Sequence, residues 1–354
     1  MKPANSSSDI GTVIVQPLYS VIVHYANEIF VNGNPKRYKY PLPIVPGGPC
    51  IARILAAPPD AVTMKAGQLA FVEMTHRARD DASTKILRGF YEGATDETRR
   101  FMRGEWQNGS WATVTNAMVE SVHPLDEEAL LGRLGYKEEL GSISTLAVAF
   151  GGLSDVNVKA GETVLVAPAT GSFGSGAVHI ALAMGARVMA MGRSEQSLQH
   201  LKSTTSDPGR IEVVKISGSV EEDAKALARF GPVDVYFDIS PDAAAKSSHR
   251  EAAIDALRIG GRISLMGGVH SDFVLPYGKI VHKELTIKGT FMSTSQQTSN
   301  LVKMVETGVL SVGERAGMRV AGKYSLEEWE TAFAAAASEA GPGRSVYFVP
   351  NGVQ

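Results

Sequence analysis

The sequence predicts an α/β protein in which a doubly wound parallel sheet is accompanied by a smaller, β-rich domain. The 354 residues indicate two or three domains, since one domain takes roughly 150 residues. Of these residues 44% are hydrophobic and 20% are charged, a balance that supports large buried cores and excludes a disordered chain. The pattern also changes near Thr163, from short β-rich segments to strands that alternate with helices, as in βαβ units.

The first part of the chain, from about Ile10 to Pro124, consists of short β-rich segments broken by proline and glycine. The expected strands of a small, irregular barrel are 12–15, 20–25, 51–55, 68–73 and 110–115. The prolines between residues 41 and 49 predict a shaped loop, because proline fits neither a helix interior nor a central strand. The charged segment 80–105 predicts a surface loop with a short helix.

The second part alternates apolar strands with helical patterns, which indicates a parallel sheet. Its first strand, 164–167, is an uninterrupted apolar run, as expected for a strand covered on both faces. The further strands are expected at 187–191, 211–214, 233–237, 262–266 and 285–289. The helices between them are expected at 175–184, 221–229 and 249–259, and the tail adds a helix at 326–339 and a strand at 345–349.

Charge and cysteine content narrow the class of protein. The formal net charge of −2 and the pI near 6.5 give no basic footprint for nucleic acid. No apolar run reaches the ~18 residues that a membrane span requires, and the polar first nine residues lack the apolar core of a signal peptide. The single cysteine, Cys50, excludes an internal disulfide. We therefore expect a cytoplasmic protein without nucleic-acid or membrane partners.

A glycine-containing turn directly follows the first parallel strand and opens a helix. It contains Gly171, Ser172, Phe173 and Gly174. A nucleotide diphosphate requires a turn whose backbone N–H groups and helix N-terminus can face it without side chains between them. Ser172 stands where the usual fingerprint has its central glycine, and an ordinary strand–turn–helix is the alternative. The position of the turn in a series of βαβ units favours dinucleotide binding by these four residues.

The end of the second parallel strand predicts which dinucleotide binds. NAD-binding proteins usually carry Asp or Glu there to bind the ribose hydroxyls. This chain has Gly192, Arg193 and Ser194 instead, which offer a guanidinium and a hydroxyl to a 2′-phosphate. We therefore predict NADP(H), with a solvated turn residue as the alternative role of Arg193.

Several blocks in the same order resemble the zinc-independent medium-chain dehydrogenase/reductase superfamily, and are similar to its quinone oxidoreductases and enoyl reductases. These blocks are 38–47, 158–166, the glycine turn, 260–264 and 285–292, and the resemblance runs from about Val13 to Val349. It implies a GroES-like substrate domain, formed by 1–147 and 295–354, and a Rossmann domain, formed by 148–294, with the reaction cleft between them. It also implies a homodimer paired through the strand near residues 285–292.

The resemblance does not extend to the zinc ligands of the superfamily. Zinc-dependent relatives carry Gly-His-Glu where this chain has Gly47, Gly48 and Pro49, and their first cysteine ligand corresponds to about Asn27. Zinc requires nitrogen, sulfur or carboxylate ligands, and the eight histidines show no metal-ligand spacing. We therefore predict a site without metal.

Without zinc, a hydrogen-bond donor must stabilise the charge that develops on the reduced substrate. The resemblance places Tyr38 in the loop that supplies a cleft tyrosine, with Tyr40 as a neighbouring candidate. His24 stands near the expected nicotinamide and could relay a proton, and Asn27 could anchor substrate through its amide. A hydrophobic wall for Tyr38, a structural role for His24 and a polar loop role for Asn27 are the alternatives.

The resemblance implies further cofactor contacts around the adenosine, the nicotinamide and the diphosphate. These residues are Ser240, Gly267, Gly268, Thr290, Met292 and Arg344. The predicted function is hydride transfer from NADPH to an activated C=C, C=O or C=N bond of a small organic substrate. A redox-neutral isomerase or cyclase that reuses the fold is the alternative, and a nucleotide-sensing or RNA-associated protein is a third.

Overall fold

The computed structural model describes residues 9–272 and 274–352, which divide into two compact units. Unit 1 comprises Met1–Ser144, Arg319–Ala340 and Arg344–Gln354, and unit 2 comprises Thr145–Met318 and Gly341–Gly343. The sequence-based division assigned 295–318 to the substrate domain, whereas these residues lie in unit 2. The assignment of substrate and nucleotide roles to the two units stays a prediction.

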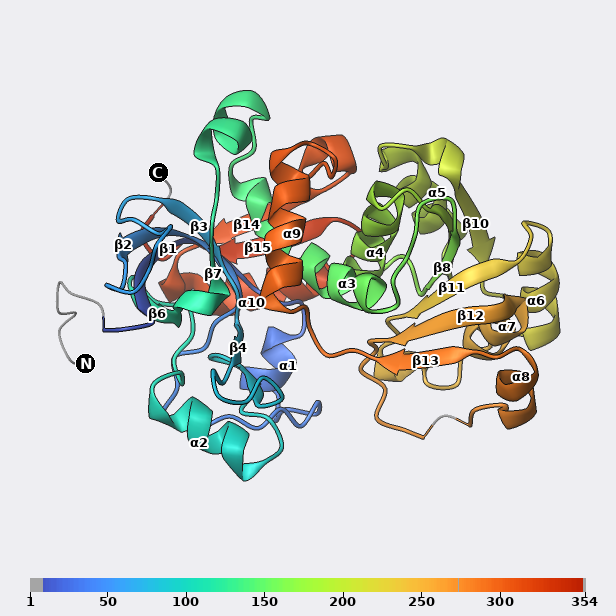
Figure 1. The fold of residues 1–354 in the computed structure, drawn as a ribbon, viewed down its shortest axis with the longest axis horizontal. Helices are drawn as coiled ribbons and strands as arrows, with labels where there is room; N and C mark the ends of the chain where they lie inside the picture. The colour runs from blue at the N-terminus through green and yellow to red at the C-terminus, as the bar shows by residue number, and fades with distance from the viewer. Residues whose placement is uncertain (1–8, 273, 353–354) are drawn as a thin grey trace. The chain divides into compact units, whose positions relative to one another are not determined.

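Unit 1 is built on a mixed sheet in the order β14-β15-β1-β2-β3-β7, with β6 also paired to β1 (Figure 1). The strands are β1 (Thr12–Val21), β2 (Cys50–Ala56), β3 (Leu69–Val72), β6 (Thr115–Met118), β7 (Val122–Pro124), β14 (Arg319–Tyr324) and β15 (Arg344–Phe348). A separate hairpin contains β4 (Thr75–Arg77) and β5 (Lys85–Leu87). Its helices are α1 (Ala26–Phe30), α2 (Asp96–Gly104) and α10 (Trp329–Ser338).

Three strand predictions in unit 1 were wrong in their bounds. The expected strands 12–15 and 20–25 form one strand that ends at Val21, because β1 passes Pro17 through a register shift against β2. The expected strand 110–115 begins only at Thr115. The Ser110 side chain instead contacts the loop at Gly48, donating to its carbonyl oxygen at 2.6 Å and accepting from its N–H at 3.1 Å.

Unit 2 contains the predicted parallel sheet, in the order β10-β9-β8-β11-β12-β13, with every strand pair parallel. The strands are β8 (Thr163–Ala167), β9 (Arg187–Gly192), β10 (Ile211–Lys215), β11 (Val233–Asp238), β12 (Leu257–Leu265) and β13 (Thr286–Gly289). The helices are α3 (Ile143–Asp155), α4 (Ser172–Ala183), α5 (Glu195–Thr204), α6 (Val220–Ala228), α7 (His249–Ala256), α8 (Tyr277–His282) and α9 (Ser295–Glu306). This topology is that of a Rossmann sheet, and it confirms the predicted fold class.

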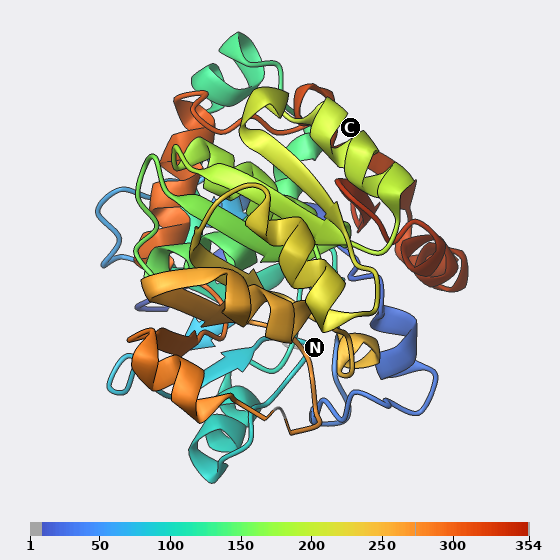
Figure 2. The ribbon, with the colours of Figure 1, turned by 90° about the vertical axis from the view of Figure 1, so that its right-hand side faces the viewer.

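The helix expected at 249–259 was too long. Helix α7 ends at Ala256, and β12 begins at the next residue, because the buried Leu257 pairs with Val233 in the sheet. Helices α6 and α7 lie side by side (Figure 2).

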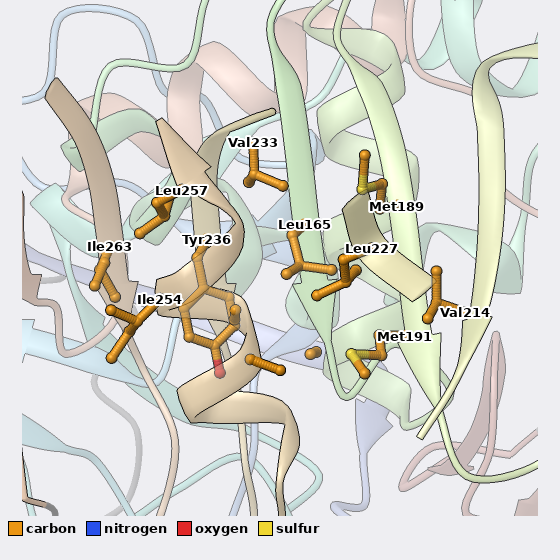
Figure 3. Packing of buried hydrophobic residues seen from close by; sticks show 13 residues of the cluster. Leu165, Met189, Met191, Val214, Leu227, Val233, Tyr236, Ile254, Leu257 and Ile263 are labelled. Carbon is orange, nitrogen blue, oxygen red and sulfur yellow. The ribbon is translucent and has the colours of Figure 1, made fainter. Parts of the chain in front are cut away.

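The core of unit 2 explains why these helices pack on this sheet. In Figure 3, Leu165 of β8 and Met189 of β9 extend from neighbouring strands into a cluster with Leu227 of α6 and Ile254 of α7. All four side chains are at most 1% exposed. Burial of one such side chain contributes about 1.5–3 kcal/mol, so this cluster holds the strand ends that carry the predicted site. In the part of the chain that the structure describes, no helix has the length and apolar character to cross a membrane.

Candidate functional site

The turn between β8 and α4 presents the helix N-terminus without a side-chain cap. Gly171 is the N-cap residue, and nothing lies within 4 Å of the place that a Cβ would take there. A Cβ at Gly174 would overlap the carbonyl oxygen of Pro168, so only glycine allows the first helical turn to pack this closely. The first-turn N–H groups of Ser172, Phe173 and Gly174 have no partner inside the helix. Together with the helix dipole they suit a diphosphate.

A short tail segment, 341–343, contacts the same helical turn. The Ser172 hydroxyl donates to the Gly341 carbonyl oxygen at 3.3 Å, and the Gly343 N–H donates to the Ser175 hydroxyl at 3.3 Å. The hydroxyl of Ser172 is therefore used within the chain, which leaves its backbone N–H for a ligand. Sequence reasoning missed this contact, since the two segments lie about 170 residues apart and share no pattern.

The carboxyl end of β9 lies against this turn. A Cβ at Gly192 would lie 3.3 Å from the Thr170 side chain, and the Ala169 N–H donates to the Met191 carbonyl oxygen at 2.8 Å. Arg193 is exposed and makes no hydrogen bond or ion pair to any residue that the structure describes. Ser194 caps α5 by accepting from the N–H of Ser197 at 3.2 Å.

A second cation, which sequence reasoning missed, ends the neighbouring strand. Lys215 of β10 aligns with Gly192 in the parallel register, and it too is exposed and unpaired among the described residues. Its place directly after the expected strand 211–214 could have indicated it. The edge formed by β9 and β10 is thus positively charged, with the guanidinium of Arg193 free to take a bidentate anion.

The predicted contacts at the ends of β11 and β12 lie close together. The Ser240 hydroxyl is fully buried and hydrogen-bonded to Nε2 of His249 at 3.0 Å. The Ser240 carbonyl oxygen accepts from the N–H of Gly268 at 2.9 Å, and a Cβ at Gly267 would approach that oxygen too closely for a side chain. Ser240 and Gly267 thus have clear packing roles, and both Gly267 and Gly268 are exposed.

Thr290 and Met292 follow β13. The Thr290 hydroxyl donates to Oδ2 of Asp155 at 2.8 Å, and Met292 has a φ of 65°, which is rare for a residue with a side chain. Burial raises the pKa of Asp155, but the hydrogen bonds from Thr290 and Gln297, with the charge of Lys288, lower it overall. Asp155 therefore stays ionised and fixes the Thr290 side chain.

Tyr38 of unit 1 is held by its own loop and by aromatic packing. Its N–H donates to Oδ1 of Asn34 at 3.1 Å, and its ring lies 5.5 Å from that of Phe90 and 5.2 Å from that of Tyr91. Burial, then the neighbouring Tyr91, raises the pKa of Tyr38, although a hydrogen bond with Tyr25 lowers it. The phenol therefore keeps its proton near neutral pH and can donate it.

His24 belongs to the same aromatic cluster. Its ring meets the Tyr25 ring edge-on at 4.8 Å. Burial, then the charge of Lys36, lowers the pKa of His24, so its imidazole is neutral at pH 7. Asn27 lies in α1, and its side-chain amide has no partner among the residues described. The Tyr40 hydroxyl, by contrast, donates to the carbonyl oxygen of Ile29 at 3.2 Å.

Arg344, the predicted diphosphate contact in the tail, lies in β15 of unit 1. Its Nη1 lies 3.1 Å from Oε2 of Glu339, which also pairs with Arg319 at 3.0 Å. The structure thus assembles the predicted residues of the glycine turn and β9 within unit 2, and Tyr38 with His24 within unit 1.

The loop expected to carry zinc ligands in related enzymes does not fit a metal here. A Cβ at Gly47 would overlap the backbone of Ser110, and one at Gly48 would overlap the carbonyl oxygen of Val21, so neither position has room for a ligand side chain. Burial raises the pKa of the Cys50 thiol to about 12, which disfavours the thiolate that binds zinc. Within the described residues, no group of three or more His, Cys, Asp or Glu is placed to hold a metal ion.

Comparison with known families and curated proteins gives partial matches. Residues 173–307 match a family described as zinc-binding dehydrogenases. The chain is 27% identical over 172 residues to an acryloyl-coenzyme A reductase of Sulfurisphaera tokodaii, covering 48% of this chain and 46% of that protein. It is 31% identical over 180 residues to an acryloyl-coenzyme A reductase of Metallosphaera sedula, covering 50% of this chain and 48% of that protein. The matches span about half the length of these relatives.

Solved structures share the fold over nearly the whole chain. The crystal structure of AibC matches with a TM-score of 0.74 at 22% identity, covering 98% of this chain and 89% of that one. The alcohol dehydrogenase TADH from Thermus sp. ATN1 also matches with a TM-score of 0.74, at 17% identity, covering 96% of this chain and 92% of that one.

Proposed function

This chain belongs to the medium-chain dehydrogenase/reductase superfamily, and on that premise we propose that it is a zinc-independent reductase that uses NADPH. Membership makes it an oxidoreductase with a nicotinamide cofactor. We propose that it transfers hydride to an activated C=C, C=O or C=N bond of a small organic molecule. The choice of NADPH rests on the residues at the end of β9, and the choice of proton donor rests on the cluster around Tyr38.

The observation that carries the choice of NADPH is the unpaired guanidinium of Arg193 at the end of β9. The end of β9 itself carries Gly192, Arg193 and Ser194 in place of an acidic residue, and the next carboxylate, Glu195, lies in α5 and accepts from Nε2 of Gln199 at 2.9 Å. Lys215 adds a second cation that is unpaired among the described residues. A 2′-phosphate would find two charge-assisted donors at this edge, whereas the 2′-hydroxyl of NADH would find no acidic residue at the end of β9.

The protein contributes orientation and a proton, while the cofactor supplies the hydride when bound. The first turn of α4 holds the diphosphate, and small residues at its start leave the backbone N–H groups free. We assign the proton donor as Tyr38, because its raised pKa keeps the phenol protonated at working pH. His24 and Asn27 would orient the substrate oxygen.

Among activated bonds, we propose the C=C bond of an α,β-unsaturated thioester as the first substrate class. Two curated relatives with partial matches are named as acryloyl-coenzyme A reductases. A thioester carbonyl delocalises the negative charge that hydride addition creates, so a hydrogen-bond donor suffices where zinc would otherwise be needed.

The test is a titration with NADPH and with NADH, followed by a substrate screen that monitors loss of the reduced cofactor. Tighter binding of NADPH than NADH, and oxidation in the presence of an enoyl thioester, enone, quinone, aldehyde or imine, is the expected result. Absence of NADPH binding contradicts the proposal. Substrate conversion without cofactor oxidation would instead favour the redox-neutral isomerase or cyclase.

We also propose a homodimer formed through the β13 edge of the six-stranded sheet. β13 has a sheet partner on one side only, and Tyr277, Val281 and Phe291 around it are 81%, 52% and 39% exposed. A second copy could pair with the open strand and cover these side chains. Light scattering should give a dimer mass for the native protein and a monomer mass for Val281→Asp. Val62→Asp, at a 93% exposed site in unit 1, is the control.

A further inference from the structure

The loop that leaves α1 (blue in Figure 1) carries two cations that the proposed reaction does not use. Arg37 and Lys39 flank Tyr38 in the sequence, and both are exposed. Neither makes a hydrogen bond or an ion pair through its side chain to any described residue. Two free cations on either side of the assigned proton donor require an explanation.

The loop has a defined shape. The side-chain amide of Asn34 makes two hydrogen bonds to the backbone of Tyr38: its Oδ1 accepts from the N–H, and its Nδ2 donates to the carbonyl oxygen. The Lys39 carbonyl oxygen accepts from the N–H of Glu92 at 2.8 Å, which ties the loop to the segment before α2. Arg37 has a φ of 56°, a conformation that costs about 1 kcal/mol or more for a residue with a side chain. The contacts of the loop thus keep Arg37 in a backbone conformation that is itself unfavourable.

The acidic groups around the loop are already paired with other cations. Glu28 lies 3.6 Å from Nζ of Lys36, which in turn lies 4.8 Å from the centre of the Tyr25 ring. The buried carboxylate of Glu92 pairs with Arg103 at 2.9 Å. The positive charges of Arg37 and Lys39 are therefore uncompensated, and they are available to an anionic ligand.

The burial of the three side chains indicates the kind of ligand. The Tyr38 ring is half-buried against Phe90 and Tyr91, whereas Arg37 and Lys39 lie in solvent. A ligand that reaches all three must carry its anionic group at a distance from its reactive bond. Coenzyme A has this form, because a long pantetheine arm separates its phosphates from the thioester.

We propose that Arg37 and Lys39 bind the phosphate groups of coenzyme A, so that the thioester of an acyl-CoA substrate reaches Tyr38. The inference rests on the proposed reductase function and specifies its substrate. The guanidinium offers a bidentate contact to a phosphate, and the ammonium acts as a point charge beside it. Both contacts are exposed, so they weaken as the ionic strength rises.

The experiment compares crotonyl-CoA with the crotonyl thioester of N-acetylcysteamine, which has the same reactive bond and no phosphate. The double variant Arg37→Asn and Lys39→Gln removes the charges, and asparagine tolerates the positive φ at position 37. We expect KM for crotonyl-CoA to rise at least 10-fold in the double variant, with kcat unchanged. Kinetics with the truncated thioester should not change.

Two further measurements complete the test. Lys65→Gln removes another exposed and unpaired lysine of unit 1, and KM should not change. Calorimetry with coenzyme A alone should show binding to the native protein, and this binding should be lost in the double variant. Equal losses with both thioesters, or undiminished binding of coenzyme A, would overturn the inference. An inability to bind NADPH would overturn the proposed function instead, because it leaves the coenzyme A titration unaffected.

Discussion

The two units position their candidate residues in different ways. In unit 2, Gly174 must be glycine because a side chain would overlap the carbonyl oxygen of Pro168, which comes six residues earlier in the same strand–turn–helix. In unit 1, Gly47 must be glycine because it packs on the backbone of Gly109 and Ser110, more than 60 residues away. The proposed nucleotide site is thus fixed by regular local backbone, and the loop next to the proposed catalytic residues by contacts between distant irregular segments.

The two sites also differ in the charge that they stabilise. The edge of β9 and β10 keeps Arg193 and Lys215 exposed, where a cation costs little. The cluster of unit 1 favours neutral side chains, because burial raises the pKa of Tyr38 and lowers that of His24. The edge of β9 and β10 is suited to bind an anion, and the cluster around Tyr38 to hold a transferable proton.

The largest expected effect comes from disturbing the regular backbone of unit 2. In Gly174→Ala the new methyl group must displace the Pro168 carbonyl, which costs about 1–3 kcal/mol as overpacking. Displacement of the first-turn N–H groups of α4 should weaken NADPH binding at least 100-fold. Fluorescence titration measures this affinity, and thermal unfolding measures the loss of stability. Gly278→Ala in α8, where nothing lies within 4 Å, should bind NADPH normally. Unimpaired binding in Gly174→Ala would remove the glycine turn from the nucleotide site.

The next effect tests the irregular loop of unit 1. Tyr38→Phe removes the assigned donor and should lower kcat about 100-fold, within the range that general acid catalysis contributes, with NADPH affinity unchanged. Tyr40→Phe is the matched control, because its hydroxyl is already bonded to the Ile29 carbonyl oxygen. Steady-state kinetics with a saturating enoyl thioester measures both variants. If kcat of Tyr38→Phe equals that of the native protein, Tyr38 only lines the site.

The fold could be predicted from sequence where apolar strands alternate regularly with helical segments. The apolar run 164–167 and the strands that follow it predicted the parallel sheet, and the first of these strands, β8, is buried at every residue. In unit 1 the strand ends were misplaced at Pro17 and Ser110, because a register shift and a side chain bonded to a distant loop decided them. Such contacts depend on tertiary structure and leave no local pattern.

The same distinction applies to the candidate sites. The glycine turn and Arg193 could be located from sequence, since both follow expected strands of a βαβ series. Lys215 directly follows the expected strand 211–214 but was missed, because the order of the strands in the sheet, which places it beside Gly192, cannot be read from the local sequence. Two contacts could be found only in the structure: that of 341–343 with α4, and the hydrogen bonds of Asn34 to the Tyr38 backbone.

A smaller effect compares the two ends of one strand in unit 2. Arg193→Ala at the carboxyl end of β9 should weaken NADPH binding about 30-fold, as expected for a charged hydrogen bond worth about 2 kcal/mol, and leave NADH binding unchanged. Arg187→Ala, at the other end of β9, removes an equally exposed arginine and should change neither affinity. Equal losses for NADPH and NADH would mean that Arg193 does not bind the 2′-phosphate.

The smallest effect separates two buried histidines, one in each unit. Burial lowers the pKa of His179 in α4 to about 4, whereas the unfolded chain titrates at about 6.5. Between these values the unfolded state binds more protons, so the free energy of unfolding falls as the pH is lowered. We expect His179 alone to account for about 1 kcal/mol between pH 7 and pH 5.5, and His179→Leu to remove that part of the slope.

His76 of unit 1 shifts in the same direction, but its ring also has a structural contact. Burial, then Arg88, lowers the pKa of His76 well below its usual value, and its Nε2 accepts from the Met118 N–H at 3.3 Å. His76→Leu should therefore destabilise the protein at every pH, by about 1–3 kcal/mol for the buried donor left unpaired. Urea unfolding at pH 7 and 5.5 distinguishes the two: both variants should lose part of the pH slope, because both pKa values are lowered, but only His76→Leu should also lose stability at pH 7. A constant loss in His179→Leu with its pH slope intact would mean that this imidazole is not buried in the neutral form.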